Sequence, residues 1–105
     1  MFSYGITYSI MNAKKLGKIR NRLAAMRLSP QRARALEKLA GQLGRQPVRR
    51  GKEPMWENVD YKLWPLAIPH HGGRDLSAGT KNSILDQLED DILAWEEKLS
   101  EEDDG

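Results

Sequence analysis

Residues 68–85 read IPHHGGRDLSAGTKNSIL and contain the end of a strand, a loop and the start of a helix. The apolar run breaks at Pro69, and the histidine pair and glycine pair that follow predict a loop. From Gly79 and Thr80 onward, apolar residues recur at helical spacing, which predicts an amphipathic helix. A strand that passes through a short loop into a helix indicates a small α+β domain.

Three short strands are predicted upstream of this loop, at residues 46–50, 55–59 and 63–68. In the third, Trp64, Leu66 and Ile68 alternate and share one face, so Trp64 is expected in the core. Residues 51–54 are predicted to form a turn or an irregular edge, because Pro54 has no N–H to donate to a neighbouring strand. We therefore expect a three-stranded antiparallel sheet packed on helices.

Two helices are predicted before the strands. The first covers residues 12–28, with Asn12 as its N-cap. The second begins at Ser29 and Pro30, a favoured cap and first position, and ends at Gly44. Their apolar faces follow spacings of three and four residues and comprise Leu16, Ile19, Leu23 and Met26 in the first and Leu36, Leu39, Ala40 and Leu43 in the second.

A long last helix is predicted over residues 79–99. Its apolar residues form a narrow seam at alternating spacings of three and four, and they are Leu85, Leu88, Ile92, Trp95 and Leu99. The first helix carries a seam of similar spacing and is the expected partner. A homodimer through the C-terminal helix is the alternative, since two heptads are too few to distinguish the two arrangements.

The chain of 105 residues is expected to form one domain over residues 12–99. Residues 1–11 are predicted to be a disordered or upstream extension, because Met11 precedes a lysine-rich segment and could be the true start in place of Met1. Residues 100–105 are predicted to be an acidic disordered tail.

The net charge of +2 conceals a strong asymmetry along the chain. Residues 14–52 contain many basic residues and a single acid, Glu37. From Asp86 onward the chain contains many acids and a single basic residue, Lys98. The first half is suited to a polyanion and the second would repel one. The alternative is that the two ends screen each other as solvated surface.

The stretch that carries the loop and the helix start resembles the closing segment of HicA-type toxins, small proteins of bacterial toxin–antitoxin pairs. The matching residues are Ile68, Pro69, His71, Arg74, Asp75, Leu76, Gly79, Thr80, Ser83, Ile84 and Leu85. The resemblance covers residues 33–88, because a helix and a basic strand also precede the sheet in that family. It implies a fold similar to the double-stranded RNA-binding fold.

The resemblance also implies a function and partners. HicA-type toxins cleave mRNA without a metal and are neutralised by a HicB-type antitoxin protein. For this chain it implies RNA contacts by Arg49, Arg50, Lys52 and Arg74, whose charges suit phosphate groups.

One position departs from the family pattern. The family reads Gly-Ser-His before the second strand, with the His associated with cleavage, whereas this chain reads Gly51-Lys52-Glu53. Glu53 is a candidate base, although its reference pKa near 4.3 makes it weaker than a His near 6.5, and His71 is the candidate acid. The alternatives are a surface ion pair at Glu53 and a catalytically silent RNA-binding or assembly module.

No metal site or cofactor is predicted. The chain has no cysteine, and Asp75 is the one carboxylate near His70 and His71, which leaves too few ligands for zinc. No apolar run approaches the length of a membrane span, and a cytoplasmic location is expected.

Overall fold

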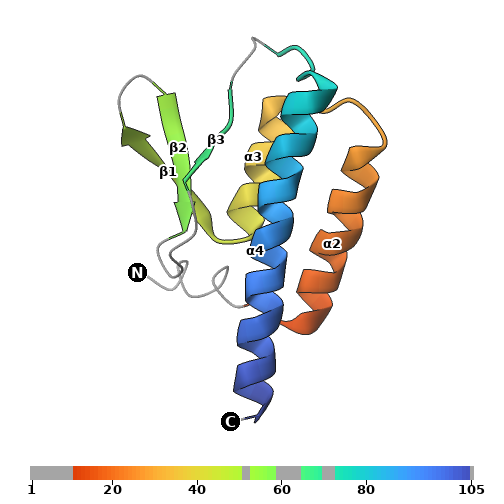
Figure 1. The fold of residues 1–105 in the computed structure, drawn as a ribbon, viewed down its shortest axis with the longest axis vertical. Coiled ribbons are helices and arrows are strands. Elements are labelled where there is room, and N and C mark those ends of the chain that lie inside the picture. The colour runs from red at the N-terminus through yellow and green to blue at the C-terminus, as the bar shows by residue number, and fades with distance from the viewer. Residues whose placement is uncertain (1–10, 51–52, 59–64, 70–72, 105) are drawn as a thin grey trace, which may run out of the picture.

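The computed structural model describes residues 11–50, 53–58, 65–69 and 73–104, and it confirms the α+β class. Within these ranges three helices and three strands follow one another: α2 (Ala13–Arg27), α3 (Ala33–Gln42), β1 (Arg45–Arg50), β2 (Glu53–Asn58), β3 (Leu66–Ala67) and α4 (Ala78–Asp104). The sheet lies on one side of α3 and α4, and α2 covers these helices from the other side (Figure 1).

The three strands form one antiparallel sheet in the order β1-β2-β3, as expected. β2 starts at Glu53 and so includes Pro54, which the sequence placed in a turn or irregular edge. Pro54 lies opposite Arg49 of β1 and precedes Met55, where pairing with β3 begins. At Pro54 β2 pairs with β1 and not yet with β3, so the missing N–H is tolerated there. Trp64, expected in the core, lies outside the described residues.

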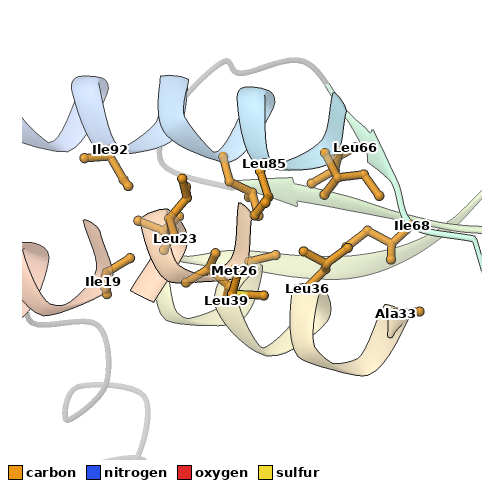
Figure 2. Packing of buried hydrophobic residues seen from close by; sticks show 14 of the residues in the cluster. Ile19, Leu23, Met26, Ala33, Leu36, Leu39, Leu66, Ile68, Leu85 and Ile92 are labelled. Atoms are coloured by element: carbon orange, nitrogen blue, oxygen red, sulfur yellow. The ribbon is translucent and has the colours of Figure 1, made fainter. Parts of the chain in front are cut away.

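Apolar residues from all three helices and from the sheet meet in one core. Figure 2 shows side chains of α2, α3 and α4 converging with Leu66 and Ile68. The predicted apolar faces of the first two helices are buried throughout. Each fully buried leucine contributes about 1.5–3 kcal/mol through removal of its surface from water, so this core is the main stabilising term.

The start of α2 is as predicted, but the start of α3 is not. The Asn12 side chain accepts a hydrogen bond from the Lys15 backbone N–H at 2.8 Å, which is a normal N-cap. The expected start at Ser29 and Pro30 is wrong, because α3 begins only at Ala33. The intervening chain is extended and pairs with the segment before α4.

That pairing is a short contact between two segments far apart in the sequence. The Leu76 N–H donates to the Gln31 carbonyl at 2.8 Å, and Arg32 forms an isolated antiparallel bridge with Asp75. The two residues before α3 therefore use their backbone groups in a β-type contact instead of a helical turn. A local cap signal in the sequence cannot anticipate such a long-range partner.

The long helix α4 packs against α2, which confirms the expected partner of its seam. Leu85, Leu88, Ile92 and Trp95 are buried, and Leu99 is half-buried. α4 continues to Asp104, whereas the sequence predicted an end near Leu99 and a disordered tail. Extending an existing helix adds one hydrogen bond for each residue ordered, and glutamates are good helix formers.

Gly44 ends α3 in a conformation that other residues rarely adopt, with φ at +96°. A Cβ at this position would lie 3.2 Å from Nδ2 of Asn58. We expect Gly44→Ala to lower the free energy of unfolding by about 1–2 kcal/mol. In this variant the positive φ is unfavourable for alanine, and the new Cβ crowds Nδ2 of Asn58.

Gly41 provides the matched control, since a Cβ there meets nothing within 4 Å. Gly41→Ala is expected to raise the free energy of unfolding by about 0.5 kcal/mol, through a lower entropy of the unfolded chain. Urea unfolding of both variants measures the difference. Equal effects of the two substitutions would contradict the role assigned to Gly44.

Candidate nucleic-acid interface

The hairpin between β1 and β2 brings three of the predicted site residues to one end of the sheet. Arg50 lies directly opposite Glu53, and Arg49 lies opposite Pro54. A predicted cationic position and the predicted base therefore occupy paired positions at the close of the hairpin. Lys52, the fourth hairpin residue of the prediction, lies outside the described residues.

The segment after β3 leaves the sheet at the same end. Because β3 is antiparallel to β2, with Leu66 opposite Trp56 and Ala67 opposite Met55, β3 runs toward the Glu53 end of β2. His71 falls in this segment but lies outside the described residues. Arg74 follows it as an exposed side chain, between Gly73, which has φ at +85°, and the bridge residue Asp75.

Two helices begin at this end of the molecule as well. Figure 1 shows α3 and α4 starting at the same end of the molecule as the hairpin, on the other side of β3, and running away from that end. Helix N-termini carry a partial positive charge from their unpaired N–H groups. Ser77 caps α4 by accepting from the Thr80 N–H at 3.2 Å, whereas Arg32 at the start of α3 makes no side-chain cap bond. We call this region, with Arg49, Arg50, Glu53 and Arg74, the hairpin end.

Three acids of α4 form ion pairs with arginines of α2. Arg27 pairs with Asp86 at 2.9 Å and with Glu89 at 3.3 Å, and Arg20 pairs with Glu96. At these three contacts the basic and acidic parts of the chain screen each other, as one of the two interpretations of the charge pattern expects.

A buried ion pair that was not predicted from the sequence joins α4 to the sheet. The Arg45 guanidinium donates from Nε to Oδ2 of Asp91 at 2.7 Å and from Nη2 to Oδ1 at 2.9 Å. Its Nη1 donates to the Trp56 carbonyl at 2.7 Å. Burial raises the pKa of the Asp91 carboxyl above its ordinary value, because loss of hydration outweighs the hydrogen bond and the charge of Arg45.

The sequence does contain a signal for this pair. Asp91 lies three residues after Leu88 and four before Trp95, so it falls on the buried stripe of α4. A carboxylate on such a stripe needs a buried cation as its partner. Lys81 is a second charged residue on the buried stripe of α4, because it precedes Ile84 by three residues. Its ammonium group donates to the backbone carbonyls of Arg27 and Ser29.

The described part of the chain holds no group of three or more His, Cys, Asp and Glu side chains arranged to bind a metal ion. None of its helices is both long enough and apolar enough to cross a membrane. Comparisons of the chain with protein family models, with curated proteins and with solved structures find no match.

Proposed function

We propose that this chain is a HicA-like toxin of a type II toxin–antitoxin pair, which binds RNA at the hairpin end and cleaves mRNA without a metal. Its RNA contacts are Arg49, Arg50, Lys52 and Arg74, and its catalytic residues are Glu53 and His71. The proposal joins the resemblance of the segment 68–85 to the arrangement of the described strands and helices.

The observation that carries the proposal is the strand register. It sets Arg50 opposite Glu53 and directs β3, and with it the chain toward Arg74, to the same end of the sheet. The N-termini of α3 and α4 add positive potential at this end. A basic surface of this kind suits recognition of RNA by its phosphates and its shape rather than by sequence.

In the proposed reaction the Glu53 carboxylate accepts the proton of a ribose 2′-hydroxyl, and the 2′-oxygen attacks the adjacent phosphorus. His71 in its imidazolium form donates a proton to the departing 5′-oxygen, which leaves a 2′,3′-cyclic phosphate. The arginines stabilise the extra negative charge on the phosphorane, because a planar guanidinium can bind two phosphate oxygens at once.

A catalytically silent RNA-binding protein is the second candidate. The observation that favours it is the sequence Gly51-Lys52-Glu53, which has a glutamate where the resembled family has its histidine. A carboxylate with an ordinary pKa is a weaker base than imidazole. In this version the hairpin end binds RNA and Glu53 serves only to pair with a neighbouring cation.

The proposed partner is a HicB-type antitoxin that covers the hairpin end and so competes with RNA. The proposed location is the cytoplasm, where mRNA is the available substrate. Both follow from the resemblance, and neither requires a cofactor.

Cleavage of a long unstructured RNA in EDTA tests the nuclease proposal. We expect the unmodified protein to shorten the RNA, and Glu53→Ala and His71→Ala each to lower the rate by about 10²- to 10⁴-fold, the usual contribution of a general acid or base. Gel analysis of cleavage over time measures the rates. Glu97→Ala, which alters an exposed glutamate of α4, is the matched control and should leave the rate unchanged.

RNA binding in low salt separates the remaining outcomes. Binding without cleavage supports the silent version and rejects the nuclease. Arg49→Ala should then weaken binding and lower the slope of log K against log salt by about 0.7, whereas Arg22→Ala on α2 should not. A protein that neither cuts nor binds RNA overturns both versions.

A further inference from the structure

The outer side of the α2–α4 pair carries a groove that the proposed function does not use. One part has a volume of about 510 Å³ and is lined by apolar residues of both helices, including Ala24, Leu28 and Leu93. Leu28 is 88% exposed and Leu93 is 56% exposed, and they are the two large apolar side chains exposed in the described ranges. A second part of about 330 Å³ continues past Gly17 and Leu99.

The two walls of this groove differ in size and in charge. The α2 wall has small residues alternating with arginines and comprises Ala13, Gly17, Arg20, Ala24 and Arg27. The α4 wall has carboxylates alternating with larger or polar residues and comprises Glu89, Leu93, Glu96 and Ser100. Both walls follow spacings of three and four residues, which is the pattern of a surface that packs against other helices.

The ion pairs set the level of each residue along the groove. Arg20 pairs with Glu96 and Arg27 pairs with Glu89, so the two helices are antiparallel. Seven residues forward along α2 correspond to seven residues back along α4. By the same count Ala24 is level with Ile92 and Leu93, between the two ion pairs. The groove therefore has an apolar centre at Ala24 and Leu93, with one ion pair on each side of it along the helices. We call these two positions the Arg20 step and the Arg27 step.

Two copies of this surface can meet about a two-fold axis in two ways. With the axis across the helices, α2 lies on α2 of the second copy, and Arg20 meets Arg27. In that arrangement Glu89 also meets Glu96, so both contacts join like charges and are unfavourable.

With the axis along the helices, α2 lies on α4 of the second copy instead. Arg20 of one copy then meets Glu96 of the other, and Arg27 of one copy meets Glu89 of the other. Opposite charges therefore face each other at both steps. The small side chain of Ala24 faces Leu93, which allows the backbones to approach closely. Charge and size are thus complementary in this one arrangement.

We propose that the α2–α4 groove binds a second copy of this chain, with α2 of each copy against α4 of the other. The buried seam is filled within one chain, so this dimer uses the outer groove and not the seam considered from the sequence. The hairpin end stays outside the contact, because α2 lies on the far side of α3 and α4 from the sheet (Figure 1).

The groove is small for a dimer contact, which indicates a weak dimer. The 15 residues of α2 span about 22 Å, and two helices side by side are about 20 Å wide, so the contact covers roughly 440 Å² per copy. Stable dimers bury about 800 Å² per partner. We therefore expect a dimer that dissociates on dilution within the micromolar range.

Sedimentation velocity across a concentration series tests the proposal with the full chain. The unmodified protein should shift from the mass of one chain to that of two, and Leu93→Glu should stay at one chain throughout. Ala25→Glu, an exposed α2 residue that does not line the groove, should still dimerise. Far-ultraviolet circular dichroism checks that each variant is folded. A constant one-chain mass for the unmodified protein overturns the proposal.

A charge exchange tests the direction of the axis. Arg20→Glu and Glu96→Arg should each be monomeric alone, because each places like charges at the Arg20 step of the dimer. Mixed in equal amounts, they should form a heterodimer, since one copy is acidic and the other basic at the same step. Arg20→Glu dimers that form as readily as the unmodified ones, or a mixture that stays monomeric, overturn the proposed arrangement.

Discussion

Asp91→Ala is expected to lower the free energy of unfolding by about 3–5 kcal/mol, one of the two largest effects expected for a single substitution. The Asp91 side chain is fully buried and the Arg45 side chain is 2% exposed, with two hydrogen bonds between them. Removing the carboxylate breaks both of these hydrogen bonds and takes away the negative charge that they bring to the buried guanidinium. For a domain with a total stability of about 5–15 kcal/mol, this loss is a large fraction.

A double substitution distinguishes the loss of the ion pair from the creation of a simple cavity. Arg45→Met combined with Asp91→Leu removes both charges and is expected to recover most of the lost stability. Recovery is incomplete because the Trp56 carbonyl also loses its donor, Nη1 of Arg45. Urea unfolding of both single variants and the double variant gives the coupling energy.

Arg20→Ala is the control, since its partner Glu96 is partly exposed. An exposed ion pair contributes at most about 1 kcal/mol, so this variant should remain close to the unmodified protein. If Asp91→Ala costs no more than Arg20→Ala, the buried pair does not hold α4 to the sheet.

Trp95→Ala is expected to lower the free energy of unfolding by about 3–5 kcal/mol. The indole is 8% exposed, packs in the core and lies over the turn at the end of α3. Its Nε1 donates to the Leu43 carbonyl at 2.8 Å. Removing the ring leaves a cavity where α4 contacts the turn that leads into β1.

Trp95→Phe separates the hydrogen bond from the packing. It is expected to cost about 1–2 kcal/mol, because Asn58 Nδ2 also donates to the Leu43 carbonyl, at 3.3 Å. Leu93→Ala, two residues earlier and exposed, should change stability by less than about 0.5 kcal/mol. Chemical unfolding of the three variants measures the order, and equal losses for Phe and Ala at position 95 would contradict the packing role.

The elements with strong local signals were predictable from the sequence. The N-cap at Asn12, the buried faces of the first two helices and the stop at Gly44 are all as predicted. The start of α3 was not, because Gln31 and Arg32 bond to residues 75–76, far away in the sequence. The end of α4 was also placed too early.

The sequence predicts the candidate site as a set of residues and leaves its geometry open. The basic strand and Glu53 can be identified from residue type and order, but the pairing of Arg50 with Glu53 requires the register of the hairpin. The charge asymmetry shows the same limit. Counting charges shows two opposed halves, whereas the ion pairs of Arg20 and Arg27 show that part of this charge is paired within the molecule.

The helix faces and the α+β class could be predicted from the sequence, because they depend on spacings of two, three and four residues along the chain. Three features could be found only in the folded chain: Arg45 and Asp91 are buried together, α2 packs on the seam of α4, and a charged groove remains outside this helix pair. The physical reason is that burial and charge pairing depend on which segments meet in space, and the residues that meet here are more than 40 positions apart in the chain.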